Sequence, residues 1–211
     1  RPDLILVHGD TSTTFAGALS AFYHRVPVGH VEAGLRTGNK FSPYPEEMNR
    51  KLTGSLADLH FAPTAVSRES LLKENVPESR IFVTGNTVID ALNTTVKKEF
   101  VFTDPVINEA LASGKRLILM TTHRRENLGD PMRGMFRAIR RVLDEHPECK
   151  AVYPIHMNPA VREAAREELE GCEKIHLIEP IGVFDCHNFE SRSYLCLTDS
   201  GGIQEECPSY G

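Results

Sequence analysis

Short apolar runs alternate with helical patterns along all 211 residues, and this alternation constrains the fold more than any other feature of the sequence. The runs are typical of buried strands, and they are separated by segments long enough to form helices. The expected strands are 4–7, 26–31, 59–62, 81–84, 117–121, 151–155, 175–178 and 194–197. The expected helices lie near 12–24, 46–57, 64–75, 87–97, 131–146, 159–170 and 185–192. This order is typical of βαβ units, so the sequence predicts an α/β fold with parallel sheets.

A change of pattern at residues 97–115 predicts a boundary between two domains. The segment KKEFVFTDPV carries charge and a proline, and a fresh strand begins at Arg116. We therefore expect one domain over residues 1–100 and a second over residues 115–211. The chain begins on a strand and stops at Pro208–Gly211, just after a helix start, which leads us to expect that it is part of a longer protein.

Composition excludes several classes of function. The chain has 24 Lys and Arg against 29 Asp and Glu, a net charge of -5, and no basic patch of the kind that nucleic-acid-binding proteins show. Its apolar runs are too short to span a membrane, and RPDLILVHGD lacks the cleavage pattern of a signal peptide. The five cysteines include no CxxC pair, so we expect neither a zinc site nor a disulfide framework. These features together favour a cytoplasmic protein.

Polar side chains follow several of the expected strands directly. Asp10 follows the first strand and Glu32 the second, and Glu46 begins the next helix behind Pro45. The carboxyl ends of parallel strands are where ligands bind in open sheets, and neighbouring strands lie about 5 Å apart. Asp10 and Glu32 can therefore share one pocket, as proton-transfer chemistry requires. Asp10 also suits an ordinary helix cap, and Glu46 with Glu47 also suits the positive end of a helix.

The second half of the chain repeats this arrangement with different side chains. His123, flanked by Arg124 and Arg125, follows the strand in RLILMTTHRREN, and His156 has a similar place in YPIHMNPAV. A histidine in a cationic loop suits an anion site or an acid/base role, although a solvated loop histidine fits equally. Ser200, Gly201 and Gly202 lie between a strand and a helix, where backbone N–H groups can meet a diphosphate. No GxGxxG follows any strand, so nothing predicts a nicotinamide cofactor.

Together these segments resemble the bacterial non-hydrolysing UDP-N-acetylglucosamine 2-epimerases. The matching stretches are long, ordered and spread over residues 8–206; they are HGDTSTTFAGALSAF, VGHVEAGLRTGNKFSPYPEEMNRKLTG, FAPTAVSRESLL, RIFVTGNTVIDAL, THRREN, PIHMNPAV and LTDSGGIQEE. The resemblance implies two Rossmann-like parallel-sheet lobes like those of B-type glycosyltransferases, with the N-terminal lobe incomplete. The chain would hold the second part of the N-terminal lobe and most of the C-terminal, UDP-binding lobe.

The resemblance also implies an activity, namely interconversion of UDP-GlcNAc and UDP-ManNAc without a metal or a redox cofactor. The implied path removes the C2 proton and expels UDP to give a bound 2-acetamidoglucal, and then returns a proton to C2 and adds UDP again with the C2 configuration inverted. The full-length enzyme would be a homodimer that supplies cell-envelope polysaccharide synthesis. The implied roles, residue by residue, are acid/base catalysis for Asp10, Glu32 and Glu46, departure of UDP for His123, phosphate and ribose contacts for Ser200, Gly201, Gly202 and Glu206, and an allosteric UDP-GlcNAc site for Arg124 and His156.

One position departs from the family pattern. Cys186, in FDCHNF, stands where the family usually has an aromatic residue that can stack on uracil. A cysteine cannot stack, so we expect a weaker uracil pocket unless Phe184 or Phe189 substitutes. Two other functions stay open at this point: a UDP-sugar hydrolase or glycosyltransferase on the same fold, and, for this fragment, a non-catalytic UDP-sugar-binding module. The second of these would not need Asp10, Glu32 and Glu46.

Overall fold

The computed structural model describes residues 1–211, which form two compact units, Arg1–Thr87 and Val88–Gly211. The division lies before the segment 97–115, where the sequence predicts the boundary. The reason is that helix α4 (Thr87–Thr95) is tied to the second unit. Asn188 Nδ2 donates to the Thr95 carbonyl at 2.8 Å, and the backbone N–H of Lys97 donates to Asn188 Oδ1 at 2.9 Å. These bonds come from a residue 91 positions or more away along the chain, which local patterns do not reveal.

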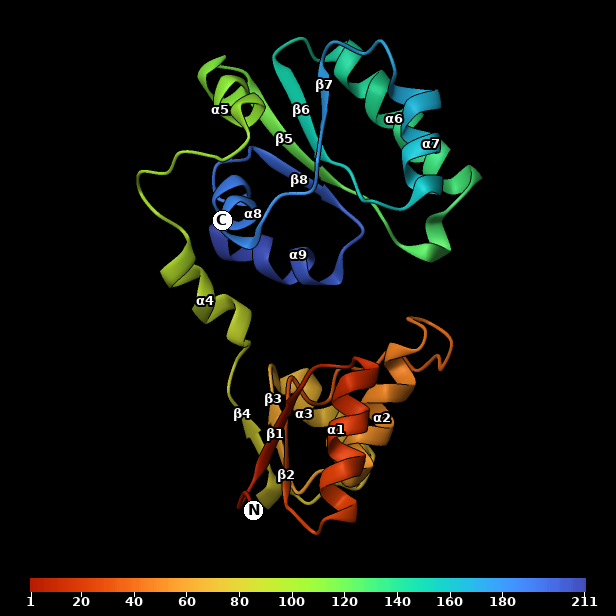
Figure 1. Ribbon diagram of the computed structural model, residues 1–211, viewed down its shortest axis with the longest axis vertical. Coiled ribbons are helices and arrows are strands. Elements are labelled where there is room, and N and C mark those ends of the chain that lie inside the picture. Colours follow the sequence, from red (N-terminus) through yellow and green to blue (C-terminus); the bar gives the residue numbers. More distant parts are fainter. The chain divides into compact units, whose positions relative to one another are not determined.

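The first unit contains one four-stranded parallel sheet in the order β1-β2-β3-β4. Its elements in chain order are β1 (Ile5–His8), α1 (Ser12–Tyr23), β2 (Val28–Val31), α2 (Glu46–Leu56), β3 (Leu59–Ala62), α3 (Ala65–Lys73), the 3₁₀ turn η1 (Glu78–Arg80) and β4 (Ile81–Val83). Because each strand pairs with the next one along the chain, right-handed crossovers bring the three helices to one face. In Figure 1, α1 and α2 lie side by side along that face.

The first unit is held together by small apolar side chains between its sheet and these helices. Val7 and Val28 from the strands pack against Ala18 and Ala21 of α1. A second cluster joins Ala62 of β3 to Leu71 of α3. Two helices begin at a threonine whose hydroxyl accepts a backbone N–H, Thr11 before α1 and Thr64 before α3. The local sequence therefore sets where each helix begins, and alanine lets α1 approach the sheet closely.

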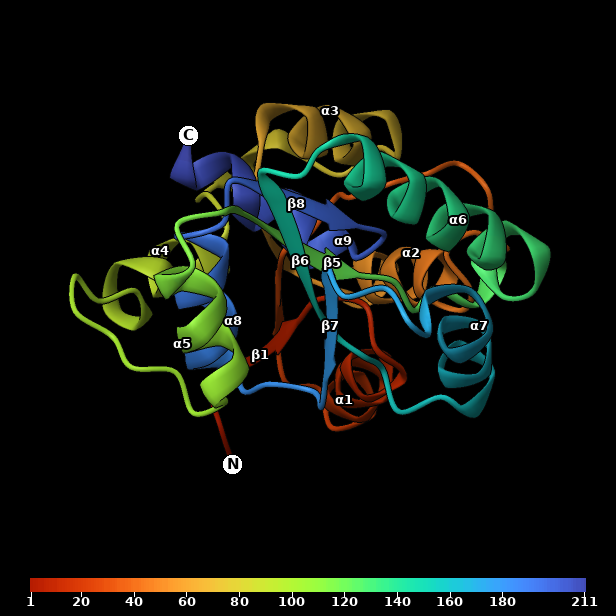
Figure 2. The same ribbon diagram turned by 90° about the horizontal axis from the view of Figure 1, so that it is seen from above.

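The second unit contains another parallel sheet, with the order β7-β6-β5-β8. After α4 its elements are α5 (Pro105–Ala112), β5 (Arg116–Thr121), the 3₁₀ turn η2 (Arg125–Asn127), α6 (Asp130–Glu145), β6 (Cys149–Pro154), α7 (Pro159–Leu169), β7 (Ile175–Ile178), α8 (Val183–Glu190), β8 (Leu195–Thr198), α9 (Gly201–Glu206) and the 3₁₀ turn η3 (Cys207–Tyr210). Figure 2 shows α6 and α7 on one side of this sheet and α5 and α8 on the other.

Strand β5 lies in the middle of two cores. Ile118 and Met120 belong to the cluster that contains α6 and α7, whereas Leu117 and Leu119 belong to the cluster that contains α5 and α8. Successive side chains of a strand point to opposite faces, so a strand covered on both faces must be apolar at every position. This explains the continuous run LILM, all four of whose side chains are buried.

The strand order reverses direction between β5 and β8. From β5 the chain proceeds outward through β6 to β7, and then α8 returns it to pair β8 with the free side of β5. The loops that follow β5 and β8 therefore start from neighbouring strands, at the point where the strand order changes direction. Such a switch point is the usual ligand site of an open α/β sheet. His123 and Ser200, singled out by sequence, lie in these two loops.

The structure confirms the expected strands and adds details of how the helices begin. The segment 97–115 contains the helix α5, which the sequence did not predict; Asp104 caps it by accepting the Val106 N–H, with Pro105 in its first turn. Gly129 is the N-cap of α6, which begins at Asp130, and the side chain of Asn158 caps α7. None of the helices has both the length and the apolar character needed to cross a bilayer.

Candidate functional site

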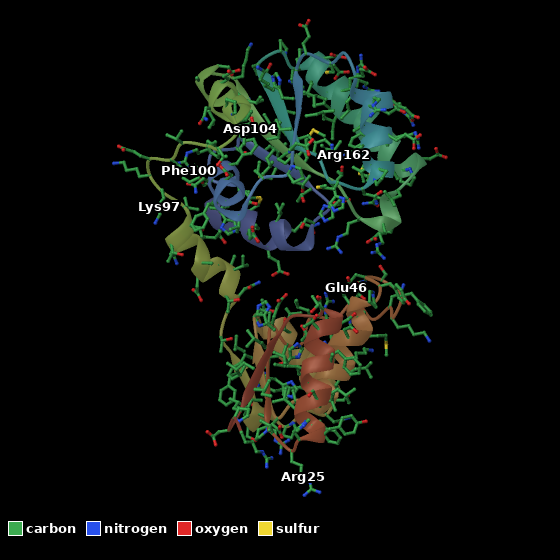
Figure 3. The ribbon with its side chains drawn as sticks, viewed as in Figure 1. Arg25, Glu46, Lys97, Phe100, Asp104 and Arg162 are labelled. Atoms are coloured by element: carbon green, nitrogen blue, oxygen red, sulfur yellow. The ribbon has the colours of Figure 1, made fainter.

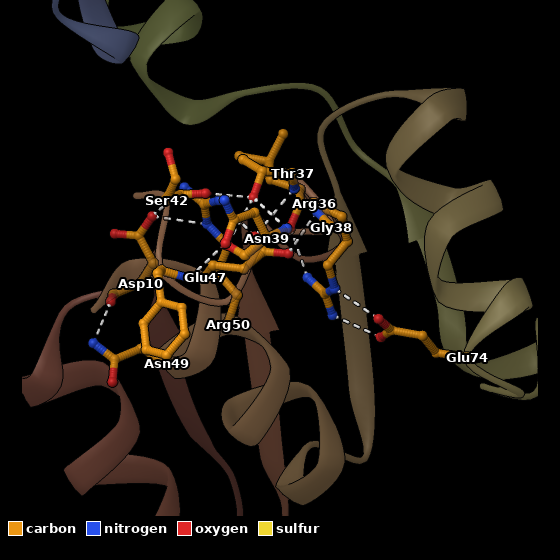
Figure 4. Close-up of polar contacts among 12 residues, drawn as sticks. Asp10, Arg36, Thr37, Gly38, Asn39, Ser42, Glu47, Asn49, Arg50 and Glu74 are labelled. Atoms are coloured by element: carbon orange, nitrogen blue, oxygen red, sulfur yellow. Dashed lines mark hydrogen bonds and ion pairs between the residues drawn. The ribbon is translucent and has the colours of Figure 1, made fainter. Parts of the chain in front are cut away.

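Asp10 lies two residues beyond the end of β1, and an arginine holds its carboxylate. Arg50 of α2 contacts Asp10 Oδ2 through Nε at 2.9 Å and through its second terminal nitrogen at 2.7 Å. Asn49 fixes the backbone as well, because its Nδ2 donates to the Asp10 carbonyl at 2.8 Å (Figure 4). The cap of α1 is Thr11 and not Asp10. The capping interpretation of Asp10 therefore fails, and its Oδ1 makes no hydrogen bond within the protein.

Glu32 lies directly after β2, the strand that pairs with β1. It has φ of 66°, a left-handed conformation that is uncommon outside glycine and is found at ligand sites. Its carboxylate lies 3.5 Å from Nε2 of His8, the last residue of β1. Gly34 makes the exit after Glu32 possible, because it has φ of 91° and a Cβ there would collide with the carbonyl of Ser67. His8 and Val31, the last residues of β1 and β2, pair with each other, so Asp10 and Glu32 follow at the same carboxyl edge of the sheet.

The two glutamates that begin α2 have different surroundings. Glu47 is fully buried and accepts the backbone N–H groups of Thr37 and Gly38, each at 3.1 Å, and a bond from Arg50 at 3.3 Å (Figure 4). Glu46 lies at the amino end of the helix (Figure 3). It is half-buried and makes none of these bonds. Glu47 thus holds the loop 37–38 on α2, while the Glu46 carboxylate stays available. Sequence alone does not reveal that Glu47 and Arg50 support the site, although Glu47 lies next to a predicted residue.

In the second unit, two histidines predicted at strand ends stack on each other. The rings of His123, after β5, and His156, after β6, have centroids 5.3 Å apart and planes 14° apart. The backbone N–H of Asn158 donates to His156 Nδ1 at 3.1 Å and holds the ring in place. Burial lowers the pKa of His123, and the nearby His156 and Arg124 lower it further, while the carboxylate of Asp199 opposes the shift.

Arg124 connects the loop after β5 with the glycine pair after β8. Its Nε donates to the Asp199 carbonyl at 3.0 Å, and its guanidinium lies against Gly201, where a Cβ would come within 3.0 Å of the terminal nitrogen. Ser200 ends the turn by donating its N–H to Thr198 Oγ1 at 2.9 Å. Gly201 and Gly202 begin α9, so their N–H groups have no partner inside the helix. A guanidinium beside free N–H groups can receive an anion.

Glu206, at the end of α9, lies near a second carboxylate of this unit, that of Glu190. Its Oε2 lies 3.5 Å from His187 Nε2, and the other ring nitrogen of His187 bonds Thr95 Oγ1 at 2.8 Å. Burial raises the pKa of Glu190 to about 7; the bond from the Cys186 thiol opposes this shift, and the charge of Glu206 adds to it. Glu190 therefore binds a proton near neutral pH more readily than an ordinary carboxyl group does.

The structure also answers the question raised by Cys186. Its thiol donates to Glu190 Oε1 at 3.2 Å, and burial raises the pKa of the thiol. Phe189 cannot replace the missing aromatic residue, because its side chain is fully buried and packs edge-on against Phe102 with centroids 6.0 Å apart. Phe184 is more than half exposed and keeps that possibility. Of the two phenylalanines expected to stack on uracil in place of the aromatic residue, only Phe184 is exposed enough to do so.

Comparison with known proteins places this chain in one family. The sequence model of the family described as UDP-N-acetylglucosamine 2-epimerase matches residues 1–211, the whole chain. The chain belongs to this family. It is 58% identical to the UDP-N-acetylglucosamine 2-epimerase of Bacillus subtilis over 211 residues, which are 100% of the chain and 54% of that protein. It is 59% identical to a putative UDP-N-acetylglucosamine 2-epimerase of Thermotoga maritima, covering 56% of it.

Solved structures agree with this assignment of the epimerase family. The S. aureus MnaA–UDP co-structure matches with a TM-score of 0.94 and 55% identity over 99% of this chain and 56% of that one. The Neisseria meningitidis UDP-GlcNAc 2-epimerase bound to UDP-GlcNAc matches with a TM-score of 0.90 and 44% identity, over 99% of this chain and 57% of that one. The chain thus spans about half the length of the curated relatives it matches.

A distant likeness concerns the fold alone. A trehalose 6-phosphate synthase from Burkholderia multivorans is 16% identical and matches with a TM-score of 0.55, over 93% of this chain and 51% of that one. The expected fold class, two Rossmann-like parallel-sheet units of the kind found in B-type glycosyltransferases, is confirmed.

Proposed function

We propose that the full-length protein interconverts UDP-GlcNAc and UDP-ManNAc by elimination and re-addition of UDP, as a non-hydrolysing UDP-N-acetylglucosamine 2-epimerase. The observation that carries this proposal is the family match over the whole chain. Acids at the strand ends of the first unit, and a histidine, an arginine and a glycine pair at the switch point of the second, support it. We also propose that the full-length enzyme is a cytoplasmic homodimer that supplies cell-envelope polysaccharide synthesis.

The carboxylates of the first unit are proposed to move the C2 proton. This proton is only weakly acidic, so a base must be held against it and a second acid must return a proton to the other face. Asp10 has one oxygen held by Arg50 and the other without a protein partner, and the Glu46 carboxylate is unengaged. Glu32 follows β2, the strand that pairs with β1 before Asp10. Acids brought to one edge in this way suit proton transfer in both directions.

The second unit is proposed to bind UDP and to assist its departure. Expulsion of UDP leaves negative charge on the diphosphate, and cationic groups with N–H donors stabilise such charge. Ser200, Gly201 and Gly202 supply the backbone donors, and Arg124 lies directly against Gly201. His123 in the neighbouring loop is proposed to give a proton to the departing diphosphate, and Glu206 to accept hydrogen bonds from the ribose hydroxyl groups.

The test is to incubate UDP-GlcNAc with the full-length protein in heavy water, with no added metal or nicotinamide, and to follow the sugar by NMR. We expect both epimers to form with deuterium at C2, because the removed proton exchanges with solvent. Epimerisation with the C2 proton fully retained would exclude the elimination path. Accumulation of free sugar and UDP, with no UDP-ManNAc, would instead indicate a hydrolase. His123→Ala should lower turnover by ~10²–10⁴-fold, the usual contribution of a positioned acid or base.

A further inference from the structure

Asp199, the residue after β8, organises the loop that follows β5. Its carboxylate accepts the backbone N–H of His123 on both oxygens, at 3.0 and 3.1 Å, and the backbone N–H of Arg124 at 3.0 Å. Asn127 Nδ2 adds a fourth bond at 2.9 Å. Only 11% of the Asp199 side chain is exposed. Hydrogen bonds to a charged acceptor are stronger than those between neutral groups. The largely buried Asp199 carboxylate therefore holds the backbone of the β5 loop firmly in place.

The same residue reaches both functional side chains of that loop. Asp199 Oδ1 lies 3.7 Å from His123 Nδ1, within the range of an electrostatic contact but too far for a hydrogen bond. The Asp199 backbone carbonyl accepts from Arg124 Nε, which holds the guanidinium against Gly201. The bond between Thr121 Oγ1 and Thr198 Oγ1, at 2.6 Å, keeps the two strand ends together below Asp199. Asp199 thus connects the β5 loop with the glycine turn across the switch point.

We propose that Asp199 is a positioning residue for the reaction, which fixes the His123 loop through its backbone N–H groups, faces the imidazole with a negative charge, and holds Arg124 beside the Ser200–Gly202 turn. This inference rests on the proposed function, because it assigns Asp199 to the departure of UDP. It also predicts an electrostatic effect that packing alone would not produce. A negative charge beside an imidazole favours its charged form, which is the form that can give a proton to the leaving diphosphate.

The charged groups around His123 determine the sign of that effect. Burial lowers the pKa of His123, as do His156 on the β6 loop and Arg124, whereas Asp199 and Glu126 of η2 raise it. Replacing Asp199 by asparagine removes the first of these two opposing charges. The pKa of His123 should therefore fall further, and the charged imidazole should be lost at a lower pH. If that form is the proton donor, the alkaline limb of the pH–rate profile must move to lower pH as well.

The experiment compares Asp199→Asn with the matched control Asp185→Asn in the full-length protein. Asp185 is also a buried carboxylate that accepts a backbone N–H and a hydroxyl, both from Thr103 at 3.0 Å, and it does not contact His123. NMR of histidine-labelled protein, with the His123 signal assigned by its loss in His123→Gln, gives the titration midpoint. The pH dependence of kcat is measured on the same variants.

We expect Asp199→Asn to move the His123 midpoint to lower pH and to lower kcat by about 10- to 100-fold, less than the ~10²–10⁴-fold loss of a whole acid or base group. The alkaline limb of kcat should shift with the midpoint, and Asp185→Asn should shift neither. Asp199→Glu keeps the charge and should keep the midpoint near that of the wild type. An unchanged midpoint in folded Asp199→Asn, or an equal shift in Asp185→Asn, would overturn the proposal.

A measurement on the unmodified protein covers the case in which Asp199→Asn does not fold. The side-chain amide of Asn127 donates to Asp199 Oδ2, so its NMR signals should titrate together with the His123 imidazole. If they do not sense that titration, Asp199 does not connect the two groups and the proposal is wrong. Both NMR titrations are independent of turnover. They therefore test the electrostatic contact between Asp199 and His123 separately from the proposed epimerase activity, which the heavy-water experiment tests.

Discussion

At the scale of single residues, the acids of the first unit separate into those that are engaged and those that are free to react. The Glu47 carboxylate accepts hydrogen bonds from Thr37, Gly38 and Arg50. Arg50 also pairs with Asp10. Arg50 therefore balances two carboxylates and keeps Asp10 in one orientation. Glu46 has no comparable partner. Adjacent glutamates in the sequence thus receive a supporting and a proposed catalytic role.

The pair Glu46 and Glu47 gives a prediction with an internal control. Glu47→Gln places an amide where two backbone N–H groups need acceptors, so we expect the free energy of unfolding to fall by about 1–3 kcal/mol. Glu46→Gln should change that free energy by less than about 0.5 kcal/mol but lower turnover by ~10²–10⁴-fold. Urea denaturation and initial rates measure the two effects. A Glu46→Gln enzyme with normal turnover would remove Glu46 from the proposed mechanism.

A buried histidine in β2 predicts how stability depends on pH. His30 donates through Nε2 to the Gly9 carbonyl at 2.8 Å, and its Nδ1 is buried without a partner. Burial lowers the pKa of His30 to about 4, against the opposing bond to Gly9 and with the help of His60. The unfolded chain therefore binds more protons than the folded one between about pH 4 and pH 6.5. Stability should be complete above pH 6.5 and fall as the pH drops towards 4.

This dependence can be measured by denaturation at a series of pH values. One such group contributes a slope of at most ~1.4 kcal/mol per pH unit. His30→Gln keeps a donor for Gly9 and removes the titration, so the slope between pH 6.5 and 5 should become smaller. His24 is exposed at the end of α1, and His24→Gln should leave the slope unchanged. Equal slopes in the wild type and in His30→Gln would show that His30 does not contribute.

At the scale of elements, the helix α4 shows why the division between the units lies where it does. Asn188 of α8 is fully buried and bonds Thr95 and Lys97, as well as Phe184 in its own helix. The side-chain amide of Asn188 thus satisfies two backbone groups where α4 ends. Leaving a buried polar group without a partner costs more free energy than one hydrogen bond contributes to stability. The helix is thereby part of the second unit, although it directly follows β4 in the chain.

Asn188→Ala should therefore destabilise the second unit by about 1–3 kcal/mol, because it leaves the Thr95 carbonyl and the Lys97 N–H without partners. Asn93, on the exposed side of α4, serves as the matched control. Asn93→Ala should stay within about 0.5 kcal/mol of the wild type. Hydrogen exchange in α4 adds a local measurement, since its amides should lose protection in Asn188→Ala. Unchanged protection there would contradict the role given to Asn188.

The length of each element was largely predictable, and its partners were not. The run LILM in β5 predicts a buried strand, and the structure shows that it is buried on both faces, with Leu117 and Leu119 on one side and Ile118 and Met120 on the other. Helix α5 escaped prediction because its apolar stretch is short, although Asp104 and Pro105 are a recognisable start signal. The neighbours of each strand depend on the path of the whole chain, which local periodicity does not record.

At the scale of the whole molecule, the proposed enzyme carries a regulatory expectation. Arg124 and His156 follow the adjacent strands β5 and β6, so both can contact one ligand. If a second UDP-GlcNAc binds there and favours the reactive conformation, it acts through its differential affinity for the two states. The stacking of His156 on His123 adds that this site would lie in contact with the proposed catalytic histidine.

We therefore predict that the rate of the full-length protein depends sigmoidally on UDP-GlcNAc, and that the reverse reaction stalls on pure UDP-ManNAc. His156→Ala should weaken the activation, and it should also lower the maximal rate because His123 loses its stacking partner. His146 pairs with Glu148 at the surface of the same unit, and His146→Ala should change neither property. A hyperbolic wild-type curve, with a reverse reaction that needs no UDP-GlcNAc, would show that no such site operates.

The sequence by itself determined the alternation of strands and helices, the parallel character of the sheets, and the placement of Asp10, Glu32 and His123 at strand ends. These features follow from local periodicity and from the polar residues that end each apolar run. The tertiary structure alone decided that Glu47 is buried while Glu46 is not, and that β8 pairs with β5 so that Asp199 lies under His123. Such contacts join residues far apart in the chain, and their energies depend on burial and geometry that exist only once the chain has folded.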